Sequence, residues 1–78
     1  IVTFQVLLRD EPGVLSSILS SFAASGGNIL TINQSIPTGD VAAVTLSAET
    51  SKLNLTLEEL VHSVERVDGV IAFEVLAG

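Results

Sequence analysis

The chain repeats one order of strand and helix patterns, and this repeat constrains its fold more than any other feature. In residues 1–8 and 28–36, apolar and polar side chains alternate, as they do in a strand with one buried face. Residues 12–25, between these two segments, carry an apolar stripe at helical spacing and begin with proline, which is favoured in a helix's first turn. Gly26 and Gly27 end this pattern. The first half of the chain therefore predicts strand, helix and strand.

The second half predicts the same order. Residues 41–49 form the next strand pattern, a helix begins at Thr56 and runs to about residue 67, and residues 70–76 form the last strand. Gly69 stands where Gly27 stands in the first half. Two such units predict an α+β, ferredoxin-like βαββαβ fold, with a four-stranded antiparallel sheet and both helices on one face.

The apolar face of each element is expected to form the core between sheet and helices. The opposite face of the sheet is rich in Thr, Ser, Asn and Gln, and is expected to meet water or a partner. The expected inward residues are Val2, Phe4, Val6 and Leu8; Val14, Leu15, Ile18, Leu19 and Phe22; Leu30, Ile32 and Ile36; Ala42, Val44, Leu46 and Ala48; and Leu57, Leu60, Val61, Val64 and Val67. Thr56 and Glu59 have the spacing of a capping box at the start of the second helix.

Length and charge restrict the class of partner. Seventy-eight residues allow one domain, and a domain this small, with 47% hydrophobic residues, often gains stability by association. The net charge is −6, and Arg9, Lys52 and Arg66 are too few and too scattered to hold a phosphate backbone or an anionic membrane. No apolar run is long enough for a membrane span. The absence of cysteine fits a cytoplasmic protein. Because the chain opens on Ile1 without a methionine, we expect it to be the C-terminal part of a longer protein.

A long stretch without charge indicates a covered surface. No Asp, Glu, Lys, Arg or His occurs from Pro12 to Gly39, although a soluble domain normally carries charge on the exposed side of each element. The second helix has an ordinary charged face, whereas the outer face of the first helix carries serines that let another surface approach without desolvating charge. This face and the following strand are predicted to be an interface; the alternative is a serine-rich helix that is merely solvated. The serines are Ser16, Ser17, Ser20, Ser21 and Ser25.

Catalysis, metal binding and cofactor binding have little support in the sequence. His62 is the only histidine, and it falls on the charged face of the second helix. No second histidine or lysine is placed to activate a serine, and no cluster of His, Cys and acids has metal-ligand spacing. We therefore expect neither a catalytic residue, nor a metal, nor a cofactor.

The loop from Arg9 to Val14 is the better candidate for a binding site. A helix start offers unpaired N–H groups and a partial positive charge to a carboxylate, and Gly13 removes side-chain bulk there. Asp10 can accept hydrogen bonds from an ammonium group, so the loop suits a free amino acid. The alternative is that Asp10 only caps the helix and Gly13 only permits the turn. Asn28, expected at the same end of the sheet, can donate and accept hydrogen bonds, or can simply follow the glycine turn.

These motifs resemble an ACT domain. The run Asp10-Glu11-Pro12-Gly13-Val14-Leu15 is followed by Gly27-Asn28-Ile29, with Asn28 sixteen residues after Pro12, and the resemblance covers the whole chain, residues 1–78. The segment from Asn28 to Gln34 is similar in particular to the small ACT-domain proteins named PheB, in which an N-terminal segment precedes the domain. The resemblance implies a regulatory domain that binds a small molecule, often an amino acid, between two copies joined through the first helix and second strand.

The resemblance also implies which residues bind. Asp10 stands at the position where family members hold the ligand. The ligand approaches the backbone groups at the positions of Gly13, Val14 and Leu15. Asn28, with Ile29 beside it, stands where an Asn of the family contacts the ligand, often from the partner chain. Serine-binding members have a histidine at the position of Leu8, so an apolar amino acid is the looser expectation here. Two alternatives stay open: an oligomerisation module without a ligand, and a chorismate mutase-type enzyme, as some PheB-like proteins are labelled. The enzyme is disfavoured because a dianionic substrate needs converging cations.

Overall fold

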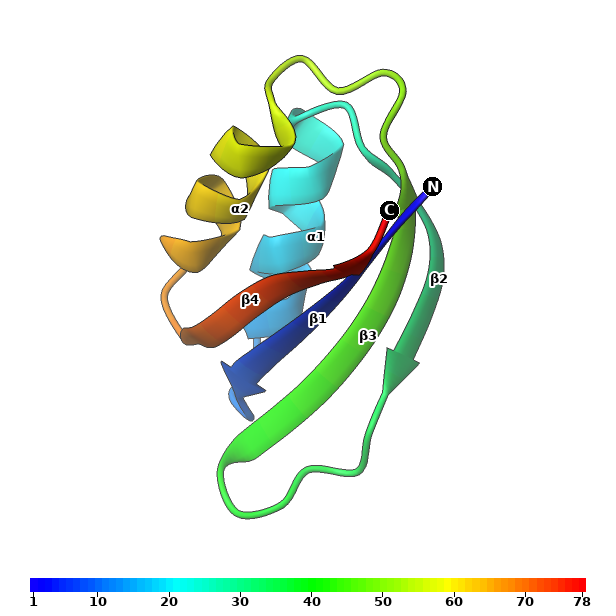
Figure 1. Ribbon diagram of the computed structural model, residues 1–78. Coiled ribbons are helices and arrows are strands. Elements are labelled where there is room, and N and C mark those ends of the chain that lie inside the picture. Colours follow the sequence, from blue (N-terminus) through cyan, green and yellow to red (C-terminus); the bar gives the residue numbers. More distant parts are fainter.

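A computed structural model describes residues 1–78 and contains four strands and two helices (Figure 1). Their order along the chain is β1 (Val2–Arg9), α1 (Val14–Ala24), β2 (Asn28–Gln34), β3 (Val41–Glu49), α2 (Leu57–Glu65) and β4 (Val70–Ala77).

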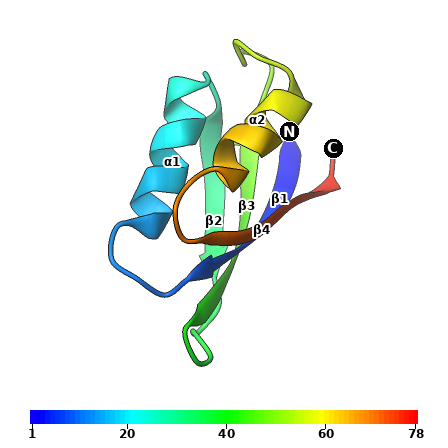
Figure 2. The same ribbon diagram turned by 90° about the vertical axis from the view of Figure 1, so that its left-hand side faces the viewer.

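The strands form one sheet in the order β2-β3-β1-β4, and all neighbouring strands are antiparallel. Both helices lie on one face of this sheet, α1 toward β2 and α2 toward β4, and the other face is open (Figures 1 and 2). The predicted ferredoxin-like βαββαβ fold is confirmed. Neither helix is both long enough and apolar enough to cross a membrane.

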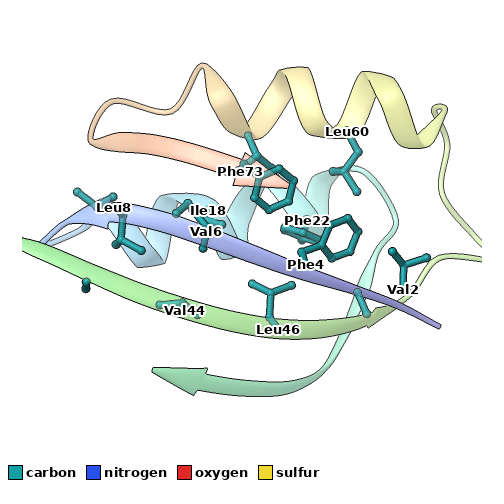
Figure 3. Packing of buried hydrophobic residues seen from close by; sticks show 14 residues of the cluster. Val2, Phe4, Val6, Leu8, Ile18, Phe22, Val44, Leu46, Leu60 and Phe73 are labelled. Carbon is teal, nitrogen blue, oxygen red and sulfur yellow. The ribbon is translucent and has the colours of Figure 1, made fainter. Parts of the chain in front are cut away.

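The core lies between the sheet and the helices, and most of the residues expected there are buried (Figure 3). All three phenylalanines meet in it. The Phe4 and Phe73 rings stack with centroids 5.2 Å apart, and Phe22 meets both of them edge-on. Such contacts add to the free energy that burial of the rings supplies. The fully or nearly fully buried set is Val2, Phe4, Val6, Leu8, Val14, Ile18, Phe22, Ala42, Val44, Leu46, Ala48, Leu60, Val64 and Phe73.

Several element boundaries differ from those predicted. The first helix begins at Val14 because Gly13 has a φ of 88°, a left-handed conformation that cannot continue a helix toward Pro12. The second strand ends at Gln34, since the chain turns away before Pro37 and leaves Ile36 90% exposed. Strands β1 and β4 each extend one residue further than predicted, and α2 ends at Glu65.

The predicted burial of the β2 face is wrong. Leu30 and Ile32 are 46% and 44% exposed, although Ile32 pairs with the buried Leu46 and therefore lies on the helix side of the sheet. β2 is an edge strand, and no other element covers its outer margin. A register shift between Ile29 and Thr31 makes Leu30 an extra residue, so Ile29 takes the place against the core opposite Ala48.

The predicted capping box begins α2. The Thr56 hydroxyl accepts a hydrogen bond from the N–H of Glu59 at 3.1 Å, and the Thr56 N–H donates to Oε1 of Glu59 at 2.9 Å. The second bond holds the pKa of the Glu59 carboxyl below its ordinary value of 4.5, with a further lowering from the Thr56 hydroxyl. A carboxyl with a lowered folded pKa stabilises the fold above its unfolded pKa. This contribution is lost as the pH falls through the lower, folded value.

We expect Glu59→Gln to reduce the acid sensitivity of the fold, because a neutral amide still accepts the Thr56 hydrogen bond but does not titrate. The measurement is the melting temperature between neutral pH and pH 3. Glu58→Gln is the matched control, since Glu58 is exposed on the same turn and makes no hydrogen bond to Thr56. If Glu59→Gln and Glu58→Gln reduced the dependence of the melting temperature on pH equally, the acid sensitivity could not be assigned to the capping box.

Candidate functional site

A hollow of about 440 Å³ opens where α1 begins. Two hydrogen bonds fix the backbone of the loop that leads into it: the Arg9 N–H donates to the carbonyl of Gly69 at 2.8 Å, and the Asp10 N–H donates to the carbonyl of Asp40 at 2.7 Å. The loop is therefore held to both neighbouring strand ends. The residues that line this hollow, called the helix-start hollow below, are Glu11, Pro12, Gly13, Val14, Ser17 and Asp68.

Asp68 enters this hollow from the turn between α2 and β4. The turn lies against α1, since a Cβ built on Gly69 would stand 2.7 Å from a methyl group of Val14. Gly69 also has a φ of 99°, so both its conformation and its close approach require glycine. In the sequence, Asp68 stands directly before Gly69, just after the end of the predicted second helix. The repeat of Gly27 and Gly69 pointed to this turn, but nothing in the sequence told which other segment it meets.

The start of α1 leaves two of its backbone N–H groups free. No side chain caps the helix and no acidic residue lies in its first turn, in contrast to α2. The N–H groups of Leu15 and Ser16 have no acceptor within the chain. The interpretation that Asp10 caps this helix is therefore wrong. Gly13 has the turn conformation expected of it, and no atom lies within 4 Å of a Cβ built there, so a ligand can reach the backbone.

The helix-start hollow combines opposite electrostatic features. The free N–H groups and the positive end of the helix dipole favour an anion. Glu11 and Asp68, which line the same hollow, favour a cation. A zwitterion with a carboxylate and an ammonium group matches both features. The lining offers only two small apolar side chains, Pro12 and Val14, which favours a ligand without a large apolar side chain.

Asp10 does not line the helix-start hollow. It lines a second hollow of about 430 Å³, together with Arg9, Glu11, Asp40, Val41 and Ile71. Glu11 is the one residue that the two hollows share. The loop predicted from sequence is thus at the surface and accessible, but its side chains divide between two sites.

Asn28 lies far from the loop within one chain, so its expected position at the same end of the sheet is wrong. It pairs with Glu49, whereas Arg9 pairs with Val41, at the opposite end of β3. Eight residues along a strand separate these positions by about 26 Å. The helix α1 runs the length of the sheet and carries the chain from one end to the other (Figure 2).

Leu15 and Ile29, the remaining expected site residues, are half-buried against the core. Their side chains are thus partly engaged in packing, and the free group at Leu15 is its backbone N–H. Neither residue lines a hollow of a single chain.

The outer face of α1 carries Ser16, Ser17 and Ser20, all exposed, and lies beside the exposed edge strand β2. Ser25 does not belong to this face. It is 5% exposed at the end of the helix, where its carbonyl accepts a hydrogen bond from the N–H of Asn54 at 2.9 Å.

The three bases do not converge. Arg9 lies at the end of β1, Lys52 in the loop before α2, and Arg66 at the end of α2, where it lines a third hollow with His62 and Glu59. The chain thus has no cluster of cations for a dianionic substrate.

Solved structures share this fold. The ACT domain from GTP pyrophosphokinase of Chlorobium tepidum superposes with a TM-score of 0.72 at 22% identity, over 96% of this chain and 95% of that one. The regulatory subunit of aspartate kinase from Thermus thermophilus, in a ligand-free form, has a TM-score of 0.71 at 14% identity, over 96% of this chain and 49% of that one. At these identities the likeness concerns the fold alone.

Relatives in sequence cover almost the whole chain. A UPF0735 ACT domain-containing protein of Caldicellulosiruptor saccharolyticus is 47% identical over 76 residues, which are 97% of this chain and 51% of the relative. A protein of the same name from Desulforamulus reducens is 49% identical over 70 residues, 90% of this chain and 47% of the relative. The chain spans about half the length of the curated relatives that it matches.

The family comparison agrees with these relatives. The family described as "AHAS small subunit-like ACT domain" matches residues 4–72, from the first strand into the last. With the βαββαβ topology and the glycine turn before α1, this match shows that the chain belongs to the ACT-domain family.

Proposed function

We propose that this domain senses a free amino acid that binds between two copies joined through α1 and β2. ACT domains are regulatory ligand-binding domains, which commonly oligomerise and bind amino acids. The relatives' names contain ACT domain but not PheB, so the narrower kinship with PheB proteins remains part of this proposal.

The observation that carries the proposal is the surface formed by α1 and β2. β2 is an edge strand with exposed apolar side chains at Leu30 and Ile32, and it carries no charged residue. An unprotected apolar edge can pair with another strand, and natural proteins usually block such edges with charge or proline. The serine face of α1 continues the same uncharged surface. A second copy that pairs along β2 would cover both elements.

Antiparallel pairing of two β2 strands about a two-fold axis accounts for the position of Asn28. Within one chain Asn28 and the start of α1 lie at opposite ends of the sheet. A two-fold axis near the middle of β2 carries the partner's Asn28 to the end where Gln34 lies, which is also the end where α1 begins. A site at the start of α1 could then receive an amide from the other copy.

The helix-start hollow supplies the ligand chemistry of the proposed site. The free N–H groups of Leu15 and Ser16 suit the ligand carboxylate, and Glu11 and Asp68 suit its ammonium group. The partner's Asn28 could donate to and accept from the same ligand. A ligand bound by both copies stabilises one dimer geometry, and any attached segment responds to that geometry by linkage.

Calorimetric titration with each of the twenty amino acids tests the sensing function. We expect heat with at least one of them. If none gives heat while sedimentation shows an intact dimer, the domain is an oligomerisation module, the alternative that the exposed β2 edge also supports.

Complementation tests the arrangement across the two copies. Each proposed site combines Asp68 of one copy with Asn28 of the other copy. In a homodimer of either variant, Asn28→Ala or Asp68→Ala, both sites lack one of these residues. Each variant is therefore expected to lose binding of the amino acid that gives heat. Mixed and re-equilibrated, the two variants form heterodimers in which one of two sites is intact. We expect about a quarter of the parent's binding capacity to return if subunits pair at random.

Two results would contradict this arrangement. If Asn28→Ala bound the amino acid as well as the parent, the Asn28 amide would not be part of the site. Full loss in both variants with no recovery on mixing would show that the residues do not act across the interface.

A further inference from the structure

The loop between β3 and α2, residues 50–56, lies against the turn that joins α1 to β2. Both connections are at the same end of the molecule (Figures 1 and 2). The loop begins beside the first residue of β2: the Ser51 N–H donates to Oε1 of Glu49 at 3.0 Å, and Glu49 is the cross-strand partner of Asn28. The proposed amino-acid site includes Asn28 but gives no role to this loop.

Asn54, in the same loop, holds the end of α1 through two hydrogen bonds. Its backbone N–H donates to the carbonyl of Ser25 at 2.9 Å, and its side-chain Nδ2 donates to the carbonyl of Ala24 at 3.2 Å. The last carbonyl groups of a helix have no partner within the helix. One residue from a distant segment therefore satisfies two of them.

The loop also packs closely on the two glycines of the turn. A Cβ built on Gly26 would overlap the backbone carbonyl oxygen of Lys52, and a Cβ built on Gly27 would stand 3.5 Å from a methyl carbon of Leu53. Leu53 is half-buried against the core, which keeps the loop in place. Since protein interiors are close-packed, a shift of the loop is transmitted to the turn.

Asn28 follows this turn directly, and the backbone alone sets its position. Its side chain is exposed and makes no hydrogen bond within the chain. On one side it is fixed by Gly27, whose N–H donates to the carbonyl of Phe22 at 2.9 Å, and on the other by its pairing with Glu49. A side chain that binds a ligand must be held within about 0.5 Å of its productive position. The hold on the turn therefore decides whether Asn28 can bind.

We propose that Asn54 is a positioning residue for the amino-acid site: it holds the end of α1 and the turn from which Asn28 reaches the site of the other copy. Asn54 acts through the backbone and not by contact with the amino acid. It lies at the Asn28 end of the sheet, opposite the helix-start hollow of its own chain. It therefore acts on the site to which its chain contributes Asn28. The inference rests on the proposed function and adds a residue to it.

Backbone-amide NMR tests the positioning without any amino acid present. Asn54→Ala removes the bond to the Ala24 carbonyl and is expected to shift the amide signals of Gly27 and Asn28. The Ser16 amide, near the other end of α1, is expected to keep its parent position. Lys52→Ala is the matched control. It shortens an exposed side chain of the same loop and keeps the backbone carbonyl beside the turn, so it is expected to leave the Asn28 amide in place.

Calorimetry tests the effect on the site, with whichever of the twenty amino acids gives heat with the parent. Asn54→Ala is expected to bind this amino acid about tenfold more weakly, while sedimentation still shows the parent's dimer. Lys52→Ala is expected to bind it within about twofold of the parent.

Mixing experiments give a readout that loss of stability alone would not produce. In a heterodimer of Asn54→Ala and Asp68→Ala, one site combines the intact Asp68 of the first chain with the well-held Asn28 of the second. About a quarter of the parent's capacity is therefore expected to return at the parent's affinity if subunits pair at random. Mixing Asn54→Ala with Asn28→Ala is expected to restore none, because every site then lacks a well-held Asn28.

The outcomes separate the positioning role from the sensing function. Recovery with Asn28→Ala instead of Asp68→Ala would overturn the inference, because Asn54 would then act on the hollow of its own chain. Parent-like affinity of Asn54→Ala would overturn it and leave the sensing function standing. If no amino acid gives heat with the parent, the sensing function fails, and the Asn28 amide signal alone decides whether Asn54 holds the turn. An unshifted Asn28 amide in Asn54→Ala would overturn that hold.

Discussion

Replacing Ile32 with arginine is expected to convert the proposed dimer into monomers. The side chain is 44% exposed on the uncovered margin of β2 and would be enclosed by the second copy. An arginine enclosed without a partner charge destabilises such an interface by about 3–5 kcal/mol. This corresponds to a rise in the dimer dissociation constant of at least about a hundredfold. Sedimentation velocity at micromolar concentration measures the change directly.

The other edge of the sheet provides the matched control. Ile71 is an isoleucine on the edge strand β4, 53% exposed, and lies outside the proposed interface. Ile71→Arg should leave the dimer intact, whereas Ser20→Arg on the outer face of α1 should disrupt it like Ile32→Arg. The proposed interface would be contradicted if the parent sedimented as a monomer. It would also be contradicted if Ile32→Arg and Ile71→Arg changed the dimer dissociation constant equally.

Gly26→Ala is expected to be the most destabilising single methyl addition. Gly26 has a φ of 86°, and a Cβ there would overlap the backbone carbonyl oxygen of Lys52. The left-handed conformation costs an alanine about 1–2 kcal/mol. Overpacking against rigid backbone adds about 1–3 kcal/mol. We therefore expect thermal unfolding about 8–40 °C below that of the parent, from the usual relation for domains of this size.

Gly39→Ala separates the two causes. Gly39 has a φ of 65°, but no atom lies within 4 Å of a Cβ built there. Only the conformational cost applies, so a loss of about 1–2 kcal/mol is expected. If both variants lose the same stability, the contact between Gly26 and Lys52 contributes nothing and the packing argument fails.

The sequence sufficed for the fold because its signals are local. Alternation in β1 identifies Phe4 and Val6 as core residues, and both are fully buried. Thr56 and Glu59 act within one helical turn, so their spacing alone predicts the capping box. The sequence predicts too early a start for α1, because proline is common at a first helical position. The left-handed conformation of Gly13 depends instead on how the loop is held to its neighbours.

The site was only partly predictable because it depends on contacts between distant segments. The loop after β1 was identified, but Asp68 reaches it through the packing of Gly69 on Val14, a contact without a local sequence signal. The sequence predicts Asn28 at the wrong end of the sheet, because α1 carries the chain from one end of the sheet to the other before β2 begins. For β2, periodicity predicted an apolar face but could not tell that the strand lies at an edge.

The position of β1 has a kinetic consequence. This strand comes first in the chain and lies inside the sheet, yet both of its partners come late: Thr3 pairs with Ser47 on one side and with Ala77 on the other. No sheet neighbour of β1 exists until more than half the chain is available. Closing such long loops slows the folding of mixed α/β domains relative to helical bundles of equal size. During synthesis from the N-terminus, the apolar residues of β1 therefore have no strand to pair with until the residues of β3 and β4 follow.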